Sequence, residues 1–432
     1  MRAFTSRALL AFTLVASLQA GTAFAAKSAE AAASQPADAV SQAFAGPFNA
    51  TQDLLKAGNG AAALAKLKEL QALPDLTPYE QYLIVHQRAQ AEYMVNDINA
   101  AVTDFEAVLA SPQLHAEDRL SIMKVIASIL YTSEQYPKAA VALQRYVDAG
   151  GPDPQLKELL PQAQYAAKDF KTAAKGFQAQ VDATLAAGKA PAEKTLRLLA
   201  ASYSQSENDA GYLATLERLA VTYPKPDYWK ELVVRVSHTD KFSDRLYVDN
   251  FRMKAHILGS VADSERIIYA ALTSRAGYPE EAKHILDEAY ASKPFTGADL
   301  AEANKLRVEV NKSVASDKLQ EASNLAAART AKDGNALFSL GLVAVTDGNP
   351  AQGLELMQQG TAKGGLRAPE EARLHLGYAQ ALAGHDADAL KTFQSITSGP
   401  TGIVPMAHVW ALYEQVKVQP PAAPAPAEAA SK

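Results

Sequence analysis

The side chains best suited to catalysis are few in this sequence and are scattered along it. The chain has eight His and no Cys. No two His stand three or four residues apart, the spacing that places two zinc ligands on one face of a helix. His375 and His385 are the nearest pair, and they fall in a helix and in the turn that follows it. The pattern therefore predicts no metal site, and the lack of Cys excludes a thiolate nucleophile.

Carboxylates and hydroxyls give no catalytic pattern either. Glu280-Glu281 and Glu370-Glu371 are adjacent acids at the starts of expected helices, where they interact favourably with the positive end of the helix dipole. Paired acid and base catalysis needs carboxylates on opposite walls of a cleft. No Ser lies in a Gly-flanked nucleophile turn, and no Lys follows a phosphate-binding Gly loop. We expect no catalytic residue and no cofactor, and hence not an enzyme.

The charge pattern argues against nucleic acid as a partner. The formal net charge is −5, and the strongest basic cluster, Lys241, Arg245, Arg252 and Lys254, is interrupted by three Asp residues. Mixed charge of this kind is typical of a solvated helix surface, whereas nucleic-acid binding needs a continuous basic patch.

The elements that would position any site are helices. Between residues 47 and 418 the chain alternates apolar-periodic blocks of about 12 to 17 residues with breaks at Gly, Pro, Asn or Asp, and no segment favours a strand. A set of small and large residues recurs at a spacing of 36: Gly341, Gly353 and Met357, then Gly377, Ala389 and Phe393. Looser copies are Ala200, Tyr203 and Leu216; Tyr93, Ala101 and Phe105; Tyr131, Ala139 and Leu143; Tyr165, Ala173 and Phe177.

These residue classes and their period resemble the tetratricopeptide (TPR) repeat. The resemblance implies an all-α fold, a right-handed superhelical solenoid of antiparallel helix pairs, with terminal helices near Phe48 and over 406–415 capping its open ends. It also implies that the first helix of each pair lines a concave groove that binds a protein or peptide. Carried over by register, the groove residues are Lys194, Arg197, Asn335, Phe338, Glu371 and Tyr378.

The first residues resemble an export signal. Arg2 and Arg7 precede an apolar run over 8–20, and Ala23-Phe24-Ala25 fits a signal-peptidase site. An uncleaved anchor is the alternative, although the run is shorter than the roughly 20 residues that span a bilayer. A lipoprotein is excluded because it needs a Cys at the cleavage site. We therefore expect a periplasmic protein, with no integral membrane segment after the signal is removed.

The resulting prediction divides the chain into six segments. Low-complexity composition predicts flexible ends, and the repeats fill most of the rest. The segments are a signal peptide over 1–25, a flexible leader over 26–46, N-terminal TPR-like repeats over 47–225, an irregular aromatic-rich connector over 226–260, C-terminal TPR repeats with a capping helix over 261–418, and a disordered Pro/Ala-rich tail over 419–432.

The connector has two interpretations. It either joins two repeat blocks and buries its aromatic residues, or it is a docking element, because Trp, Tyr and Arg are enriched in interface hot spots. The candidate docking residues are Tyr228, Trp229, Arg245, Tyr247 and Phe251. Together with its flanking repeats this segment resembles uncharacterised periplasmic TPR proteins found beside TonB/ExbB/ExbD-type energy-transduction systems.

Taken together, the sequence predicts an exported scaffold or adaptor that binds other proteins in the bacterial cell envelope, in the service of a TonB-type system. Two alternatives stay open. One is an accessory protein or enzyme of peptidoglycan metabolism, although no stretch of about a hundred residues is left for a catalytic domain. The other is a carrier that holds a small ligand within the solenoid.

Overall fold

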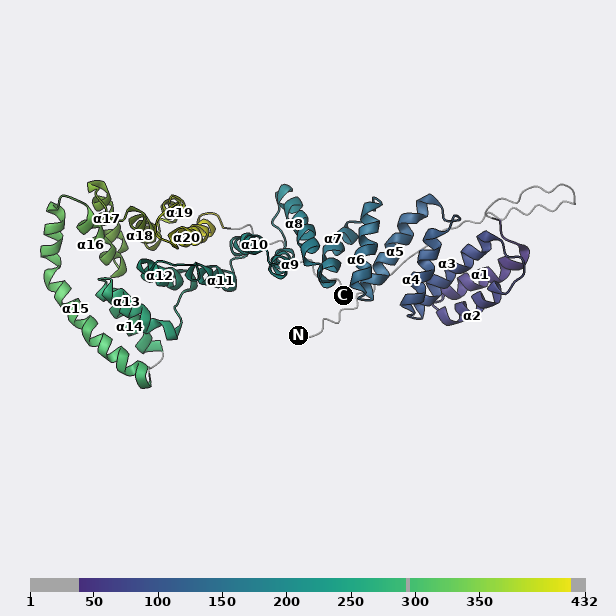
Figure 1. Ribbon diagram of the computed structural model, residues 1–432, viewed down its shortest axis with the longest axis horizontal. Coiled ribbons are helices and arrows are strands. Elements are labelled where there is room, and N and C mark those ends of the chain that lie inside the picture. Colours follow the sequence, from purple (N-terminus) through teal and green to yellow (C-terminus); the bar gives the residue numbers. More distant parts are fainter. Residues whose placement is uncertain (1–38, 293–295, 421–432) are drawn as a thin grey trace. The chain divides into compact units, whose positions relative to one another are not determined.

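The structure is a computed structural model that describes residues 39–292 and 296–420 (Figure 1). These residues form twenty α-helices and two short 3-10 helices without a strand, so the predicted all-α fold of antiparallel helix pairs is confirmed. None of the described helices has the length and apolar character needed to cross a membrane. The predicted signal peptide and the tail from residue 421 lie outside the described residues.

The chain divides into two compact units, residues 1–116 and 117–432. The described part of the first unit holds two helix pairs: α1 (Gln42–Lys56), α2 (Gly60–Gln71), α3 (Pro78–Met94) and α4 (Ile98–Ala110). Helix α1 begins inside the predicted flexible leader, because Phe44 is fully buried. The Glu80 carboxylate also accepts hydrogen bonds from the backbone N–H groups of Ser41 and Thr77, which ties the starts of α1 and α3 together.

The second unit begins with three further helix pairs. After the 3-10 helix η1 (Ala116–Asp118) they are α5 (Arg119–Thr132), α6 (Tyr136–Asp148), α7 (Pro154–Ala166), α8 (Phe170–Ala186), α9 (Glu193–Gln205) and α10 (Asp209–Thr222). The remaining elements are α11 (Pro226–Ser237), η2 (Asp244–Leu246), α12 (Tyr247–Leu258), α13 (Asp263–Arg275), α14 (Pro279–Ser292), α15 (Gly297–Thr330), α16 (Asn335–Thr346), α17 (Pro350–Lys363), α18 (Pro369–Leu382), α19 (Asp386–Gln394) and α20 (Ile403–Val418).

The same turn geometry joins the two helices in many of the pairs. The first helix ends in a residue with left-handed φ, between 56° and 90°, and the next N–H reaches back to a carbonyl five residues earlier, as Asp97 does to Glu92 and His385 does to Gln380. This is the Schellman arrangement, which satisfies carbonyls at a helix C-terminus. The left-handed residues are Gly58, Asn96, Glu134, Lys168, Glu207, Gly277, Gly348 and Gly384.

The two best-matched repeats pack as their residues predict. A Cβ on Gly377 would lie 2.6 Å from the Phe393 ring, and one on Gly341 would lie 2.6 Å from the Gly353 carbonyl oxygen. Phe393 itself is 1% exposed. The predicted close approach of the two helices in each of these pairs is therefore confirmed.

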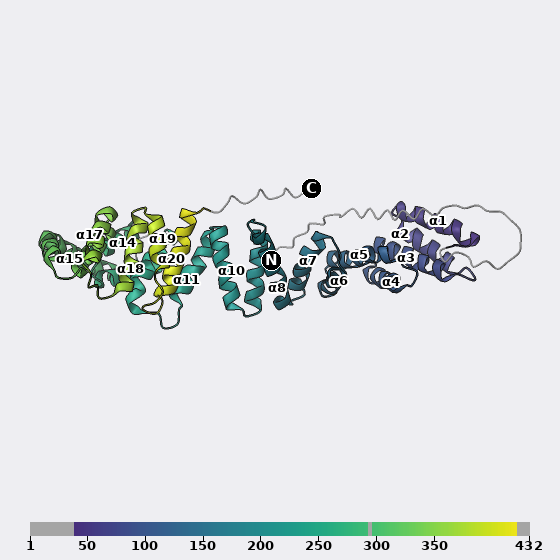
Figure 2. The same ribbon diagram turned by 90° about the horizontal axis from the view of Figure 1, so that it is seen from above.

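Helices α11 to α20 close on themselves instead of continuing an open solenoid. Helix α20 pairs with α19 and also packs against α10, α11 and α12, so segments far apart in sequence lie side by side (Figures 1 and 2). In the core that they share, Trp410 stacks on Phe393 with ring centroids 5.2 Å apart, and Trp229 meets Tyr413 edge-on at 5.3 Å. We call helices α11 to α20 the closed body. Residues 406–415, expected to cap the last helix pair, thus pack against α10, α11 and α12 as well as against α19.

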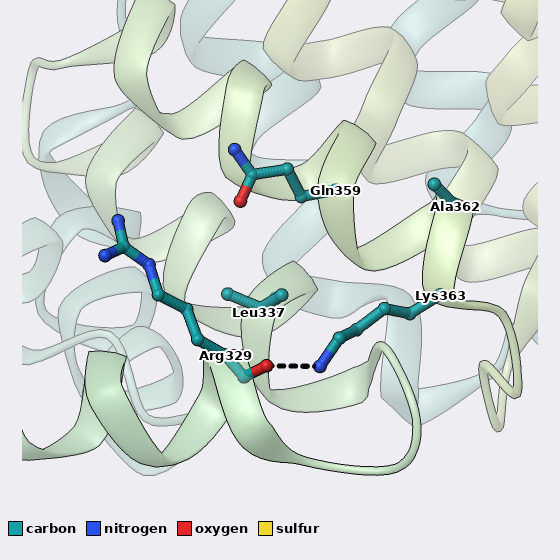
Figure 3. A pocket seen from close by; sticks show the side chains of 5 residues that line it. All are labelled: Arg329, Leu337, Gln359, Ala362 and Lys363. Carbon is teal, nitrogen blue, oxygen red and sulfur yellow. Dashed lines mark hydrogen bonds between the residues drawn. The ribbon is translucent and has the colours of Figure 1, made fainter.

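Helix α15 forms the outer arc of the closed body, with α13, α14, α16 and α17 on its inner side (Figure 1). Its first half buries Ala303, Val310 and Val314, the stretch from Ala315 to Ala327 has no buried residue, and Ala328 is buried near the C-terminal end. At its C-terminus the Lys363 ammonium donates hydrogen bonds to the carbonyls of Ala328, Arg329 and Ala331 at 3.3, 2.7 and 2.7 Å. Figure 3 shows the bond from Lys363 to the Arg329 carbonyl. The residues drawn there line a shallow hollow of about 400 Å³.

Candidate partner-binding surfaces

Two of the predicted groove residues lie on an exposed helix face. Lys194 and Arg197 are both exposed on α9. Lys194 Nζ lies 3.4 Å from Gln162 Oε1 on α7, so the first helices of two successive pairs meet at this face. On the other side, Tyr228 of α11 donates a hydrogen bond to Glu193 of α9 at 2.6 Å. We call the side chains of α7, α9 and α11 around Lys194 and Arg197 the α9 face.

The α9 face carries cationic groups without partners of their own, together with two exposed acids, Glu158 of α7 and Asp227 of α11. Among the described residues Arg197 has no hydrogen bond and no ion pair, and exposed Lys230 on α11 has none either. Glu193 is already bound, since its carboxylate accepts from Lys225 and Tyr228, and these bonds hold its pKa below the ordinary value. Arg presents a planar fork of donors that matches a carboxylate in a bidentate manner. The α9 face can therefore bind acidic side chains.

Several aromatic side chains of the connector are buried in the folded core. Trp229 is 4% exposed and Phe251 is 7% exposed, and Phe251 stacks on Tyr269 at 4.9 Å. Burial, followed by the bond to Glu193, raises the pKa of Tyr228 to about 12, so that its hydroxyl remains a donor. Of the candidate docking residues only Arg245 and Tyr247 have exposed side chains. This placement agrees with the interpretation that the segment buries its aromatic residues.

The groove residues predicted in the C-terminal repeats have intramolecular partners. Phe338 is 6% exposed and belongs to a core cluster. Asn335 donates to the Gly365 carbonyl and accepts from the Arg367 N–H, and Glu371 pairs with Arg245 at 2.8 Å. Tyr378 meets Trp410 edge-on at 5.9 Å. The structure thus brings Lys194 and Arg197 together at an open surface and places the other four inside or against the closed body.

A buried ionic network inside the closed body was not visible in the sequence. Arg252 is 2% exposed, and its guanidinium donates to both carboxylate oxygens of Glu281, at 3.0 and 2.6 Å, and to Asp249 at 3.0 Å. Tyr269 donates to the same Glu281 at 3.1 Å, and the Tyr278 ring lies 4.5 Å from the guanidinium carbon. We call these groups, with His375, the Arg252 network.

Two interpretations from the sequence are corrected by this network. The charges around Arg252 do not form a solvated helix surface, because α12 is packed between α11, α13 and α20. Glu281 does more than interact with a helix dipole, since it is 7% exposed and neutralises a buried cation. The sequence signal was weak: Asp249 and Arg252 have the three-residue spacing of an ion pair, but their partners on α14 and α18 are distant in the chain.

No protein-family model and no curated protein sequence matches the chain. Solved structures do align with it. The C-terminal part of a TPR repeat-containing protein from Cytophaga hutchinsonii is 16% identical over 59% of this chain and 98% of that one, with a TM-score of 0.28. Yeast Tom70 is 13% identical over 87% of this chain and 96% of that one, with a TM-score of 0.20. TM-scores of this size do not establish a common overall architecture.

Proposed function

We propose that the protein is a scaffold whose α9 face holds an acidic segment of a partner protein. One observation carries this proposal: Lys194 and Arg197 are exposed side by side on α9, the first helix of its pair, whereas their counterparts in the C-terminal repeats are engaged by the closed body. Hydrogen bonds from Arg to a carboxylate are charge-assisted, and they are stronger than hydrogen bonds between neutral groups. The closed body then forms the end of the scaffold, and α11 connects it to the α9 face.

We further propose that the protein acts in the bacterial cell envelope after export, in the service of a TonB-type energy-transduction system. The support is the signal-like pattern over residues 1–25 and the resemblance of the connector and its neighbours to periplasmic TPR proteins beside such systems. Fractionation of cells expressing the full chain tests export. A chain found in the periplasm and cut after Ala25 supports it, and an uncleaved chain in the cytoplasm contradicts it.

The binding proposal is tested by crosslinking in cells followed by purification of the tagged chain. The informative variant is Lys194→Glu/Arg197→Glu, which reverses the charge of the α9 face at exposed positions. We expect one defined protein to be captured by wild type and its yield to fall at least about ten-fold in the variant, because like charges now face the acidic segment.

The matched control is Arg373→Glu/Lys391→Glu, which removes as much positive charge from exposed positions of α18 and α19. This control should capture the partner as wild type does. Equal loss in the control would mean that net charge, and not the α9 face, decides capture.

A further inference from the structure

A second surface lies between α6, α7 and α8. These helices enclose a groove of about 470 Å³. Its floor is formed by Leu160 and Pro161 of α7 and by Gly176 and Ala179 of α8, and its rim carries Lys157 and Lys175. The groove lies within the second unit, where α6, α7 and α8 are consecutive neighbours (Figure 2).

The groove has a local cause in the sequence. Pro161 stands inside α7, where it has no N–H to donate to the Lys157 carbonyl. Its ring packs on Gly176, where a Cβ would lie 2.8 Å from the Pro161 Cβ. The proline therefore fills the space that a side chain at position 176 would occupy. Gly176, Ala179 one turn further along α8 and Ala183 beyond it give this wall a line of small side chains, beside Lys175 and Gln180.

This groove is distinct from the α9 face. A helix turns by about 100° per residue, so Leu160 lies about 160° around α7 from Gln162, the residue that contacts Lys194. Lys157 and Gln164 lie about 140° and 160° from Gln162 as well, so these groove residues are on the other side of α7. A ligand here would leave Lys194 and Arg197 free.

The side chains that line the groove determine which kind of ligand can bind there. The floor is apolar, and Val141 of α6, 71% exposed, extends the apolar surface one turn from the lining residue Gln144. Lys157 and Lys175 are exposed, neither makes an ion pair within the described residues, and no acidic side chain lines the groove. From Thr172 to Ala183 the α8 wall is about 17 Å long, which matches three turns of helix.

We propose that this groove docks an amphipathic helix of a partner protein, with an apolar stripe flanked by acidic residues. Helix-in-groove recognition places apolar side chains at i, i+3 and i+7 in the floor. The flanking carboxylates pair with Lys157 and Lys175 at the rim, where charge complementarity sets orientation and discriminates between partners. The scaffold then has two independent binding surfaces on opposite sides of α7.

Two stapled helical peptides test the proposal with the full chain, by fluorescence anisotropy. Both carry Leu at i, i+3, i+7 and i+10, and one is flanked by Glu and the other by Lys. We expect the Glu-flanked peptide to bind at least about ten-fold more tightly than the Lys-flanked one. Lys157→Glu/Lys175→Glu should invert this preference. Ala179→Trp, which fills the floor, should abolish binding, and Ala210→Trp at an exposed site on α10 should not.

Any of three results would overturn the proposal. The first is equal binding of the two peptides, or no binding by either up to about 1 mM, the range of the weakest specific complexes. The second is a preference that survives the charge reversal at positions 157 and 175. The third is loss of binding in Lys194→Glu/Arg197→Glu with full binding in Ala179→Trp, which would assign the peptide to the α9 face.

Discussion

His375 Nε2 on α18 lies 3.0 Å from Asp249 Oδ1 on α12, although 126 positions separate the two residues. The same Asp249 accepts from Arg252, which reaches Glu281 on α14. Burial opposes ionisation of Asp249, yet His375 and Arg252 hold its pKa below the ordinary value. With Tyr269 of α13, one polar network therefore joins four helices of the closed body, α12, α13, α14 and α18.

Removing the central cation of the Arg252 network should be strongly destabilising. Arg252→Met leaves the Glu281 carboxylate buried without a counter-charge and leaves Asp249 with His375 alone, and we expect the free energy of unfolding to fall by about 3–5 kcal/mol. Denaturant unfolding followed by Trp fluorescence measures it, because the only two Trp residues, 229 and 410, lie in the closed body. Arg373→Met, at an exposed position, should change it by less than about 0.5 kcal/mol; a similar small change in Arg252→Met would contradict the role of the network.

The contact between α16 and α17 should not tolerate a single added methyl group. In Gly353→Ala the new Cβ would lie 2.5 Å from the Gly341 carbonyl oxygen and 2.4 Å from a Val345 methyl. We expect a loss of about 1–3 kcal/mol, since the helices must separate. The control Gln352→Ala is exposed on the same helix and should be neutral or slightly stabilising. Thermal melts followed by circular dichroism compare them, and equal melting temperatures would refute the close packing.

The sequence predicted local geometry better than long-range closure. Gly341 and Gly377 were identifiable because a repeat needs a small residue where two helices touch. The turns at Asn96, Glu134, Lys168 and Glu207 were harder to recognise, because they adopt left-handed φ without Gly. Periodicity within one helix pair is a local property, and it reports nothing about which distant helix covers an exposed face.

The wide apolar side of helix α20 was a sequence signal of its extra contacts. Its buried apolar residues Ile403, Met406, Ala407, Val409, Trp410 and Ala411 spread over more than half of the helix circumference. Packing on a single neighbour needs only a stripe about 100° wide. The α9 face, by contrast, followed from repeat register alone, since Lys194 and Arg197 fall at exposed positions of an ordinary pair.

The packing of α20 against α10 can be tested by measuring the distance between these two helices. The chain has no Cys, so Glu217→Cys/His408→Cys places two spin labels on α10 and α20, at side chains whose ends are 3.2 Å apart. Electron–electron double resonance should give one narrow, short distance distribution, because α20 is packed against α10. A broad distribution at long distance would show that α20 leaves α10 and that the solenoid is open.

The closed body should lose stability as pH rises because of Glu414. This side chain is fully buried. Burial, reinforced by Asp386 and opposed by Lys417, raises its pKa from 4.5 to about 7. The folded state then holds the proton more tightly than the unfolded state, so the contribution of Glu414 to stability falls between about pH 4.5 and pH 7.

The variant Glu414→Gln removes this titration. Its free energy of unfolding relative to wild type should therefore increase between pH 5 and pH 8, by at most about 3 kcal/mol. The lowered pKa of His256, which burial and Lys417 bring to about 4, is present in both proteins and largely cancels in the difference. Denaturant unfolding at the two pH values gives the result, and a difference independent of pH would rule out a buried, protonated Glu414.

The most direct test of the proposed function is photo-crosslinking from single positions in living cells. A benzoylphenylalanine placed at Arg197 or Lys230 samples the α9 face, and one at Arg373 or Ser339 samples exposed positions of α18 and α16 in the closed body. The account predicts that the same partner protein is crosslinked from Arg197 and Lys230 and is absent from Arg373 and Ser339. A partner crosslinked from the closed body and missing from the α9 face would contradict it.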